Sequence, residues 1–196
     1  KSIMKDKISK RIKSAAENFN KLINDDDLKK NLYEITSLCI KAFKNDKKLL
    51  LCGNGGSASD AQHIAAELSG RFYFDRPPLN AEALHVNSSF MTAVANDFGY
   101  EETYARMLEA NGKKGDVLIA ISTSGNSKNV INAVSKANEL GLVTIGFTGF
   151  NGGKLNDICD LILRAPNDDT PRVQEAHILF GHIICQIIEE EMFPNV

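Results

Sequence analysis

The sequence has no tryptophan, few cysteines and no long run of apolar residues. Its four cysteines are scattered and include no C-x-x-C pair, so they fit neither a disulfide framework nor a zinc ribbon. Because each stands beside apolar residues, we expect buried free thiols in a reducing compartment. No apolar stretch approaches the ~20 residues that cross a bilayer, and no signal peptide is recognisable, so we expect a soluble cytoplasmic protein without a membrane partner. The cysteines are Cys39, Cys52, Cys159 and Cys185.

The chain also lacks an excess of positive charge. Its formal net charge is -2 at pH 7, which leaves no global basic field, and we expect no nucleic-acid partner. Hydrophobic residues make up 43% and charged residues 24%, which is typical of a globular protein. A length of 196 residues suits one well-buried domain better than two. We therefore expect a single domain over residues 1–196.

Two amphipathic helices are predicted before any strand. In the first segment the apolar residues recur at three- and four-residue steps and form one stripe: Ile8, Ile12, Ala15, Ala16, Phe19, Leu22 and Ile23. Asn24 and the aspartates at 25–27 interrupt the pattern and offer an N-cap for a second helix. Its stripe consists of Leu28, Leu32, Ile35, Leu38, Cys39, Ala42 and Phe43. These stripes need a partner surface, and neighbouring subunits would provide one.

From residue 47 onward the pattern changes to short continuous apolar runs that alternate with helices. The runs lie at 49–52, 116–121, 142–147 and 160–163, and helices are predicted at about 57–69, up to about 140, and from about 171 to the end. Such strands indicate a parallel sheet covered on both faces, which is the α/β class. The segment 81–112 is less regular. It predicts a helix capped by Asn87-Ser88-Ser89 and a second short helix at 102–110.

Two loops that follow predicted strands are rich in small hydrogen-bonding residues. The first loop, residues 53–59, reads G-N-G-G-S-A-S, and the second loop, residues 122–127, reads S-T-S-G-N-S. In an open parallel sheet, ligands bind beyond the carboxyl ends of the strands. Hydroxyls, backbone N–H groups and a helix N-terminus together form an anion site. One such loop is easily a simple capped turn, but two on neighbouring strands favour a phosphate ligand.

The first loop also fits the dinucleotide pattern G-x-G-x-x-A through Gly53, Gly55 and Ala58, with Asp75 near the position of a ribose-binding acid. The stretch before Asp75 is short and is followed by two prolines, so it does not predict the second strand that this pattern requires. A dinucleotide enzyme therefore remains a minority alternative.

A third feature is a set of metal-ligating and acid/base side chains on two predicted helices. His63 and Glu67 are four residues apart and lie on one helix face, where they either hold a divalent metal or form a surface pair. Gln174 and His182 are eight residues apart, which corresponds to about 12 Å along a helix. A distortion near Gly181, or donation from two subunits, would let them share one ion.

His177 lies outside this alignment and is expected to be structural or exposed.

Four blocks of the sequence resemble one known family. Residues 51–63, L-C-G-N-G-G-S-A-S-D-A-Q-H, with E-L-S-G-R-F at 67–72, resemble the signature of the phosphoheptose isomerases. These sugar isomerase (SIS) domain enzymes convert sedoheptulose 7-phosphate to D-glycero-D-manno-heptose 7-phosphate. N-D-F-G-Y at 96–100, I-S-T-S-G-N-S at 121–127, and R-V-Q-E at 172–175 together with His182 also resemble that family. The resemblance covers nearly the whole chain, including the two leading helices.

The resemblance implies a fold, an assembly and a metal. The fold is a single SIS-type α/β domain with a five-stranded parallel sheet flanked by helices, in which residues 1–45 are the helices used in oligomerisation and 46–196 the α/β core. The assembly is a homotetramer with its sites between subunits. The metal is one zinc per subunit, held by His63, Glu67, Gln174 and His182.

The resemblance also implies roles for the loops. The phosphate is taken by Ser122, Thr123, Ser124 and Ser127. The first loop through Asn54, Gly55, Gly56 and Ser57, together with Asn96, Asp97 and Gln174, lines the sugar. Arg71 is a candidate second phosphate contact.

Aldose–ketose exchange needs a base for a carbon-bound proton and an acid for the carbonyl oxygen. We hypothesise that Glu67 is the base and His182 the acid, with zinc stabilising the enediolate. Because metal binding lowers the basicity of a carboxylate, Glu67 would have to leave the metal when substrate binds. The product would serve heptose synthesis for a surface polysaccharide, either lipopolysaccharide or capsule.

His85 and Asn87 stand where the resemblance implies small or acidic residues in many relatives, and they either line the sugar or lie in a subunit contact. Two rival functions remain within the same fold: a paralogue that binds the DNA replication initiator without catalysis, and a sensor of sugar phosphates. The four candidate metal ligands are all present in this chain, which favours an enzyme.

Overall fold

The computed structural model describes residues 2–194 and 196. Its centre is a five-stranded sheet with the strand order β2-β1-β3-β4-β5 and only parallel pairs. Valine, leucine and isoleucine dominate the central strands, whose residues are buried because helices cover both faces. The strands are β1 (Leu49–Gly53), β2 (Ala81–Ala83), β3 (Val117–Ile121), β4 (Val143–Thr148) and β5 (Leu161–Arg164).

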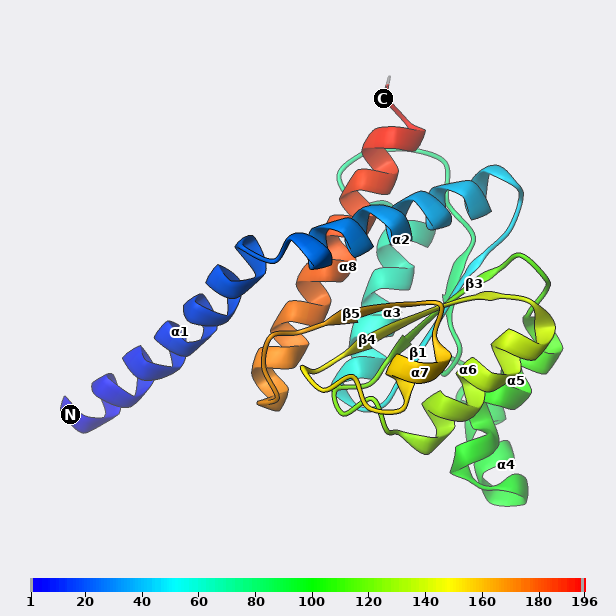
Figure 1. Cartoon of the computed structure of the whole chain (residues 1–196). Coiled ribbons are helices and arrows are strands. Elements are labelled where there is room, and N and C mark those ends of the chain that lie inside the picture. The colour runs from blue at the N-terminus through cyan, green and yellow to red at the C-terminus, as the bar shows by residue number, and fades with distance from the viewer. Residues whose placement is uncertain (1, 195) are drawn as a thin grey trace.

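Helices form a layer on each side of this sheet (Figure 1). One layer contains α2 (Asp26–Lys44), α3 (Gly56–Ser69) and α8 (Thr170–Met192). The other contains α4 (Ser88–Phe98), α5 (Thr103–Asn111), α6 (Lys128–Leu140) and α7 (Leu155–Ile158), with a short 3-10 turn, η1, at Tyr100–Glu102. The arrangement confirms the α/β class and the flanked parallel sheet predicted from the sequence.

Alternation along β1 divides the interior into two cores. Leu49 and Leu51 face α2, α3 and α8, whereas Leu50 and Cys52 face α5 and α6. Successive side chains of a strand point to opposite faces, so one short apolar run fills both cores. This is why the run at 49–52 shows no polar residue.

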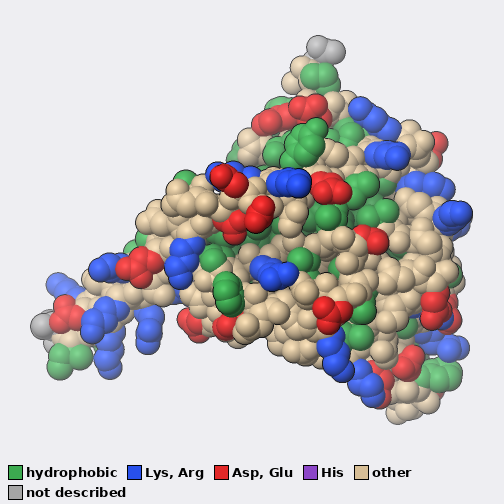
Figure 2. All heavy atoms as spheres, viewed as in Figure 1, with side chains coloured by type: hydrophobic (Ala, Val, Ile, Leu, Met, Phe, Trp, Pro, Cys, Tyr) green, Lys and Arg blue, Asp and Glu red, His purple; other side chains and the backbone are tan. Residues whose placement is uncertain are grey.

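The first helix, α1 (Ser2–Ile23), projects away from the rest of the molecule (Figure 1). Near its end Asn18 is buried and its Nδ2 donates to the carbonyl of Arg172, at 3.1 Å. Farther out, Ile8 and Ile12 are 54% and 67% exposed, so the outer part of the predicted apolar stripe has no cover within one chain, whereas Leu22 near its end is buried. Figure 2 shows many lysine and arginine side chains on this projecting helix.

Several details of the predicted elements are confirmed. Asp25 accepts from Leu28 N at 2.9 Å and caps α2, while Asn87 accepts from Phe90 N at 3.0 Å and caps α4. Both helices after the first loop and the second loop are present, as is the short helix near 102–110. The strand β2 was not predicted, because three residues with two alanines carry little strand signal.

Two further findings concern the cysteines and the search for membrane-spanning helices. All four cysteines are free; Cys39, Cys52 and Cys185 are buried, as expected, whereas Cys159 is only partly buried. Within the described part of the chain, no helix combines the length and apolarity that crossing a bilayer would take.

Candidate functional site

The helices α3 and α8 lie side by side at very close range. A Cβ built on Gly181 would come within 2.5 Å of Ile64 Cγ1, so any larger residue at this position of α8 would collide with α3. One turn later, Cys185 Sγ lies 3.9 Å from the carbonyl oxygen of Ile64. The helix α8 runs unbroken through Gly181, so the distortion considered from the sequence is absent. Instead, Gly181 allows close packing of the two helices.

This close packing brings three predicted site residues together. His63 Nε2 lies 2.9 Å from Glu67 Oε1, and the rings of His63 and His182 meet edge to face with their centroids 5.2 Å apart. The three side chains form what we call the acid/base cluster. Burial lowers the pKa of His182, and the neighbouring His63 lowers it further, while Glu67 acts in the opposite direction. His182 is therefore biased toward the neutral imidazole.

Gln174 lies at a different level of α8. A Cβ built on Gly56 would stand 3.1 Å from Gln174 Cδ, which places this amide against the start of α3. The separation of Gln174 from His182 thus follows the two helical turns expected from their spacing. Within one chain, Gln174 belongs with the first loop and not with the acid/base cluster.

The donors of the acid/base cluster suit zinc by type, since imidazole nitrogen and carboxylate oxygen are common zinc ligands. Among residues 2–194 and 196, however, no three His, Cys, Asp or Glu side chains are arranged so that they could hold one ion. In the described part of the chain, the cluster thus provides suitable donors next to one another without a preformed set of three such ligands.

The first loop is held in place by amide and phenol groups. Asn54 and Asn129 exchange two side-chain hydrogen bonds, at 2.8 and 2.9 Å, which tie this loop to the start of α6. Tyr100 Oη donates to Asn54 Oδ1 at 3.1 Å, and Tyr104 Oη donates to the carbonyl of Gly53. A Cβ on Gly53 would come 2.6 Å from Ser57 O, so only glycine allows this tight strand-to-helix turn.

The second loop presents hydroxyl groups at the start of α6. Ser122 is buried, and its Oγ lies 3.1 Å from Ser127 Oγ. Ser127 occupies the N-cap position, yet its side chain makes no capping hydrogen bond to the helix. Gly125 has a φ of +67°, and a Cβ there would come 2.6 Å from the carbonyl carbon of Gly152. Hydroxyls and a helix N-terminus thus converge as an anion site requires.

The other predicted residues of the two loops differ in their exposure. Thr123 is partly buried, Ser124 is exposed and Ser57 is buried, while Gly55 has a φ of +55° at the N-cap of α3. Ser124 Oγ accepts from Asn126 N at 3.1 Å, and the carbonyl of Thr123 accepts from Gly149 N at 2.9 Å.

Other predicted residues do not join the acid/base cluster. Asn96 and Asp97 lie at the exposed end of α4 and are joined by a side-chain hydrogen bond of 2.9 Å. Since α4 packs against η1 and α5, these residues lie in the layer opposite α3 and α8. Arg71 is exposed just beyond the end of α3.

His85 and Asn87, whose roles the sequence left open, have clear contacts. His85 is partly buried with its Nε2 3.2 Å from Gln62 Oε1, and burial lowers its pKa. Asn87 is the N-cap of α4. His177, placed outside the site by its spacing, is fully buried and its Nε2 lies 2.9 Å from Thr148 O. It is a structural histidine.

Within one chain, the acid/base cluster lies farther along α3 than the first loop. Gly56 is seven residues from His63 and 11 from Glu67, which corresponds to about 10 and 16 Å along the helix axis. The segment before Asp75 contains no strand, so the first loop lacks the context of a dinucleotide fingerprint.

Several residues that support the site were not foreseen. Asn129, Tyr100 and Tyr104 hold the first loop, and the ring of Phe72 stacks on His182 with centroids 5.7 Å apart. These partners are far apart in sequence, so spacing alone carries no signal for them.

Comparisons with known proteins agree with this architecture. The family model described as the SIS domain matches residues 6–149. The chain is 51% identical over 190 residues to the phosphoheptose isomerase of Clostridium acetobutylicum, with 97% of each sequence covered. It is 46% identical over 192 residues to the phosphoheptose isomerase of Aneurinibacillus thermoaerophilus, covering 98% of this chain and 97% of the relative.

Solved structures lead to the same family. The phosphoheptose isomerase of Neisseria gonorrhoeae matches with a TM-score of 0.90 and 37% identity, over 95% of this chain and 99% of that one. That of Francisella tularensis matches with a TM-score of 0.89 and 34% identity, over 94% and 97%. The chain therefore belongs to the SIS domain family and, within it, to the phosphoheptose isomerases, which are aldose–ketose isomerases.

Proposed function

We propose that this isomerase interconverts sedoheptulose 7-phosphate and D-glycero-D-manno-heptose 7-phosphate, as a step toward the heptose of a surface polysaccharide. The observation that carries the proposal is the acid/base cluster, in which a carboxylate and two imidazoles meet within hydrogen-bonding and ring-contact distance. The hydroxyl-rich second loop at the start of α6 supports a phosphorylated substrate.

In the proposed mechanism, the Glu67 carboxylate takes the proton from the ketose carbon that becomes the aldehyde. His182 supplies a proton to the neighbouring carbonyl oxygen, and an enediol results. The same two groups then return a proton to the second carbon and remove one from the first hydroxyl. Since burial biases His182 toward the neutral form, its N–H and its free nitrogen can serve these two steps in turn.

We further propose that zinc is held by His63, Glu67, Gln174 and His182. When bound, the metal would supply Lewis-acid polarisation of the substrate oxygen. The donor types of the acid/base cluster support this assignment, while Gln174, at the level of the first loop, would have to approach the cluster or come from a neighbouring subunit.

The same reasoning supports a homotetramer with sites between subunits. The outer part of α1 exposes an apolar stripe that one chain leaves uncovered. In one chain the acid/base cluster begins about 10 Å along α3 from the first loop, so a neighbour that brings its own cluster to the two loops would complete a site.

The test is incubation of the protein with sedoheptulose 7-phosphate, following the aldose product, before and after treatment with a chelator. We expect aldose formation, loss of activity with the chelator, and recovery on addition of zinc. Metal content of the untreated protein, measured by atomic spectroscopy, should approach one zinc per subunit. No aldose under any of these conditions would refute the proposed reaction, whereas full activity in metal-free protein would refute only the zinc.

A further inference from the structure

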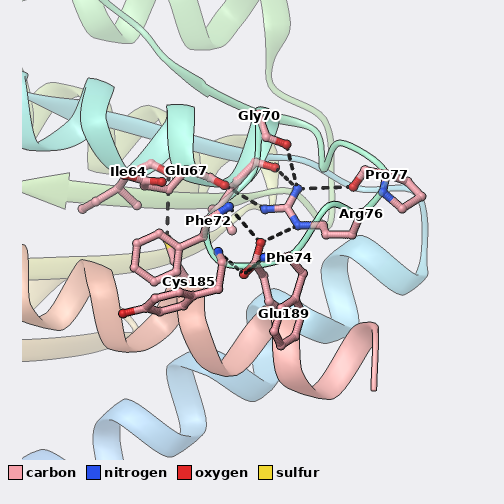
Figure 3. Close-up of polar contacts among 11 residues, drawn as sticks. Ile64, Glu67, Gly70, Phe72, Phe74, Arg76, Pro77, Cys185 and Glu189 are labelled. Atoms are coloured by element: carbon pink, nitrogen blue, oxygen red, sulfur yellow. Dashed lines mark hydrogen bonds and ion pairs between the residues drawn. The ribbon is translucent and has the colours of Figure 1, made fainter. Parts of the chain in front are cut away.

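A buried ion pair joins α8 to the irregular segment that follows α3. Arg76 Nε donates to Glu189 Oε1 at 2.8 Å, and the two side chains are 0% and 1% exposed (Figure 3). A charge this deeply buried is costly unless it is paired and its remaining hydrogen-bonding groups are satisfied. The contacts around this pair are therefore informative about what it holds in place.

The Glu189 carboxylate organises the backbone of the segment 70–77. It accepts from three consecutive N–H groups, those of Phe72 at 2.9 Å, Tyr73 at 2.7 Å and Phe74 at 3.2 Å. This segment forms neither helix nor strand, so the carboxylate takes the place of a regular hydrogen-bonding partner. Burial raises the pKa of Glu189, but these donors and Arg76 outweigh it and the net pKa is lowered. The carboxylate is thus held in its charged form.

The Arg76 guanidinium holds the end of α3. Its Nη2 donates to the backbone carbonyl of Glu67 at 2.7 Å, and its Nη1 donates to those of Leu68 at 2.7 Å and Gly70 at 3.2 Å. The last carbonyls of a helix lack partners within the helix, and a cation there is favourable. Arg76 therefore fixes the helical turn from which the Glu67 side chain projects.

The same pair reaches His182 through Phe72. Glu189 anchors the backbone of Phe72, whose ring stacks on the His182 ring with a centroid distance of 5.7 Å and an interplanar angle of 29°. One buried pair is therefore connected to both proposed catalytic groups, to Glu67 through its backbone and to His182 through a stacked ring.

We propose that Arg76 and Glu189 are positioning residues that set the relative placement of Glu67 and His182 for proton transfer. This inference rests on the proposed function. Misplacement of catalytic groups by a fraction of an ångström to an ångström lowers turnover, and loss of supporting residues typically costs about 10- to 100-fold. Substrate binding through the second loop would be little affected.

The test compares Glu189→Gln and Arg76→Lys with a matched control, Asp116→Asn. Asp116 is also a buried carboxylate in an ion pair, with the partly buried Lys48 Nζ at 2.8 Å, and it accepts from backbone N–H groups of Lys48 and Lys113, in the loops before β1 and β3. For folded variants we expect kcat to fall about 10- to 100-fold in Glu189→Gln and Arg76→Lys, with KM changed by less than about threefold. The control, at a similar loss of melting temperature, should keep kcat within about threefold of the unchanged enzyme.

A second variant keeps the proposal falsifiable if the ion-pair variants do not fold. Phe72→Leu leaves the backbone bond to Glu189 intact but removes the ring that stacks on His182, and it should lower kcat about tenfold without raising KM. Turnover equal to that of the control in Phe72→Leu, or in either folded ion-pair variant, would overturn the positioning role while the proposed reaction stands. An unchanged enzyme that forms no aldose would instead overturn the proposed function, and this proposal with it.

Discussion

Gly181 of α8 lies against the side chain of Ile64 of α3, and a Cβ on Gly181 would come 2.5 Å from Ile64 Cγ1. In the interior of a helix, glycine normally costs about 0.5–1 kcal/mol relative to alanine. The glycine is kept here because it lets the two helices approach until His63 and His182 touch. The helix α8 thus contains a residue of low helix propensity because the geometry of the acid/base cluster requires it.

We predict that Gly181→Ala lowers the free energy of unfolding by about 1–3 kcal/mol, because overpacking forces α3 and α8 apart. It should also lower turnover, since the separation moves His182 away from His63 and Glu67. Urea unfolding and steady-state kinetics measure the two effects.

The control for this clash is the double variant with Ile64→Ala, which removes both colliding atoms. If the clash is the cause, the two substitutions together should destabilise less than the sum of their separate effects. Simple additivity would show that Gly181 matters for another reason.

We predict that Glu67→Gln abolishes turnover while leaving phosphate binding largely intact. Glutamine keeps the size of the side chain and a polar contact to His63, but it cannot accept a proton from carbon, so kcat should fall by about 10²- to 10⁴-fold. Substrate affinity can be followed by calorimetry. Glu190→Gln, an exposed position of α8 whose carboxylate accepts from Gln186 at 2.9 Å, is the matched control. Near-normal turnover in Glu67→Gln would remove the base from the mechanism.

Much of the fold was predictable because its signals are local. The runs at 49–52 and 142–147 lie almost wholly inside strands, and Asp25 and Asn87 cap the helices as their positions indicated. The strand β2 escaped because it is three residues long and contains Ala81 and Ala83, whose small side chains show no strand pattern.

The site was less predictable because its geometry depends on contacts between distant residues. The spacing of His63 and Glu67 indicated a shared helix face, and the structure places them 2.9 Å apart. That His182 joins them depends on how closely α8 approaches α3, which no spacing within either helix encodes. The supports are more remote still, since Asn54 and Asn129 are 75 positions apart and Arg76 and Glu189 are 113 apart.

We predict that Ser122→Ala raises KM for the sugar phosphate about 10- to 100-fold with a smaller effect on kcat. A hydrogen bond to a charged group contributes about 1.5–3 kcal/mol, and Ser122 is a buried hydroxyl of the second loop. Competition by inorganic phosphate should weaken in parallel. Ser37→Ala is the control, because that hydroxyl is exposed on α2 and donates to the carbonyl of Tyr33 in its own helix. Equal KM values in both variants would place the phosphate elsewhere.

We predict that Ile12→Glu dissociates the proposed tetramer. Ile12 is 67% exposed in a single chain and lies in the apolar stripe of α1, so a charge there would be buried without a partner if the stripe forms an interface. Light scattering after gel filtration should report smaller species, and activity should fall if sites form between subunits. Lys10→Ala changes the same helix without altering the stripe and should keep the assembly. An unchanged assembly in Ile12→Glu would show that the stripe is not the interface.

Finally, we predict that the free energy of unfolding falls in acid because of His177. Burial lowers the pKa of this imidazole from its ordinary value of 6.5 to about 4, although the hydrogen bond to the Thr148 carbonyl acts in the opposite direction. Between these two pH values the unfolded chain binds the proton and the folded chain does not. The contribution of His177 to the free energy of unfolding is therefore fully present above about pH 6.5 and is lost as the pH drops toward 4. The loss for this one group totals about 3 kcal/mol.

The measurement is urea unfolding at pH 7.5 and pH 5 at one protein concentration, for the unchanged enzyme and for His177→Gln. Glutamine can still donate to Thr148 O but does not titrate, so its variant should lose less stability on acidification. The difference between the two proteins isolates His177 from the other histidines, because His85 and His182, whose pKa values burial also lowers, are present in both. Parallel losses in the two proteins would mean that His177 is already protonated in the folded state or is reached by water.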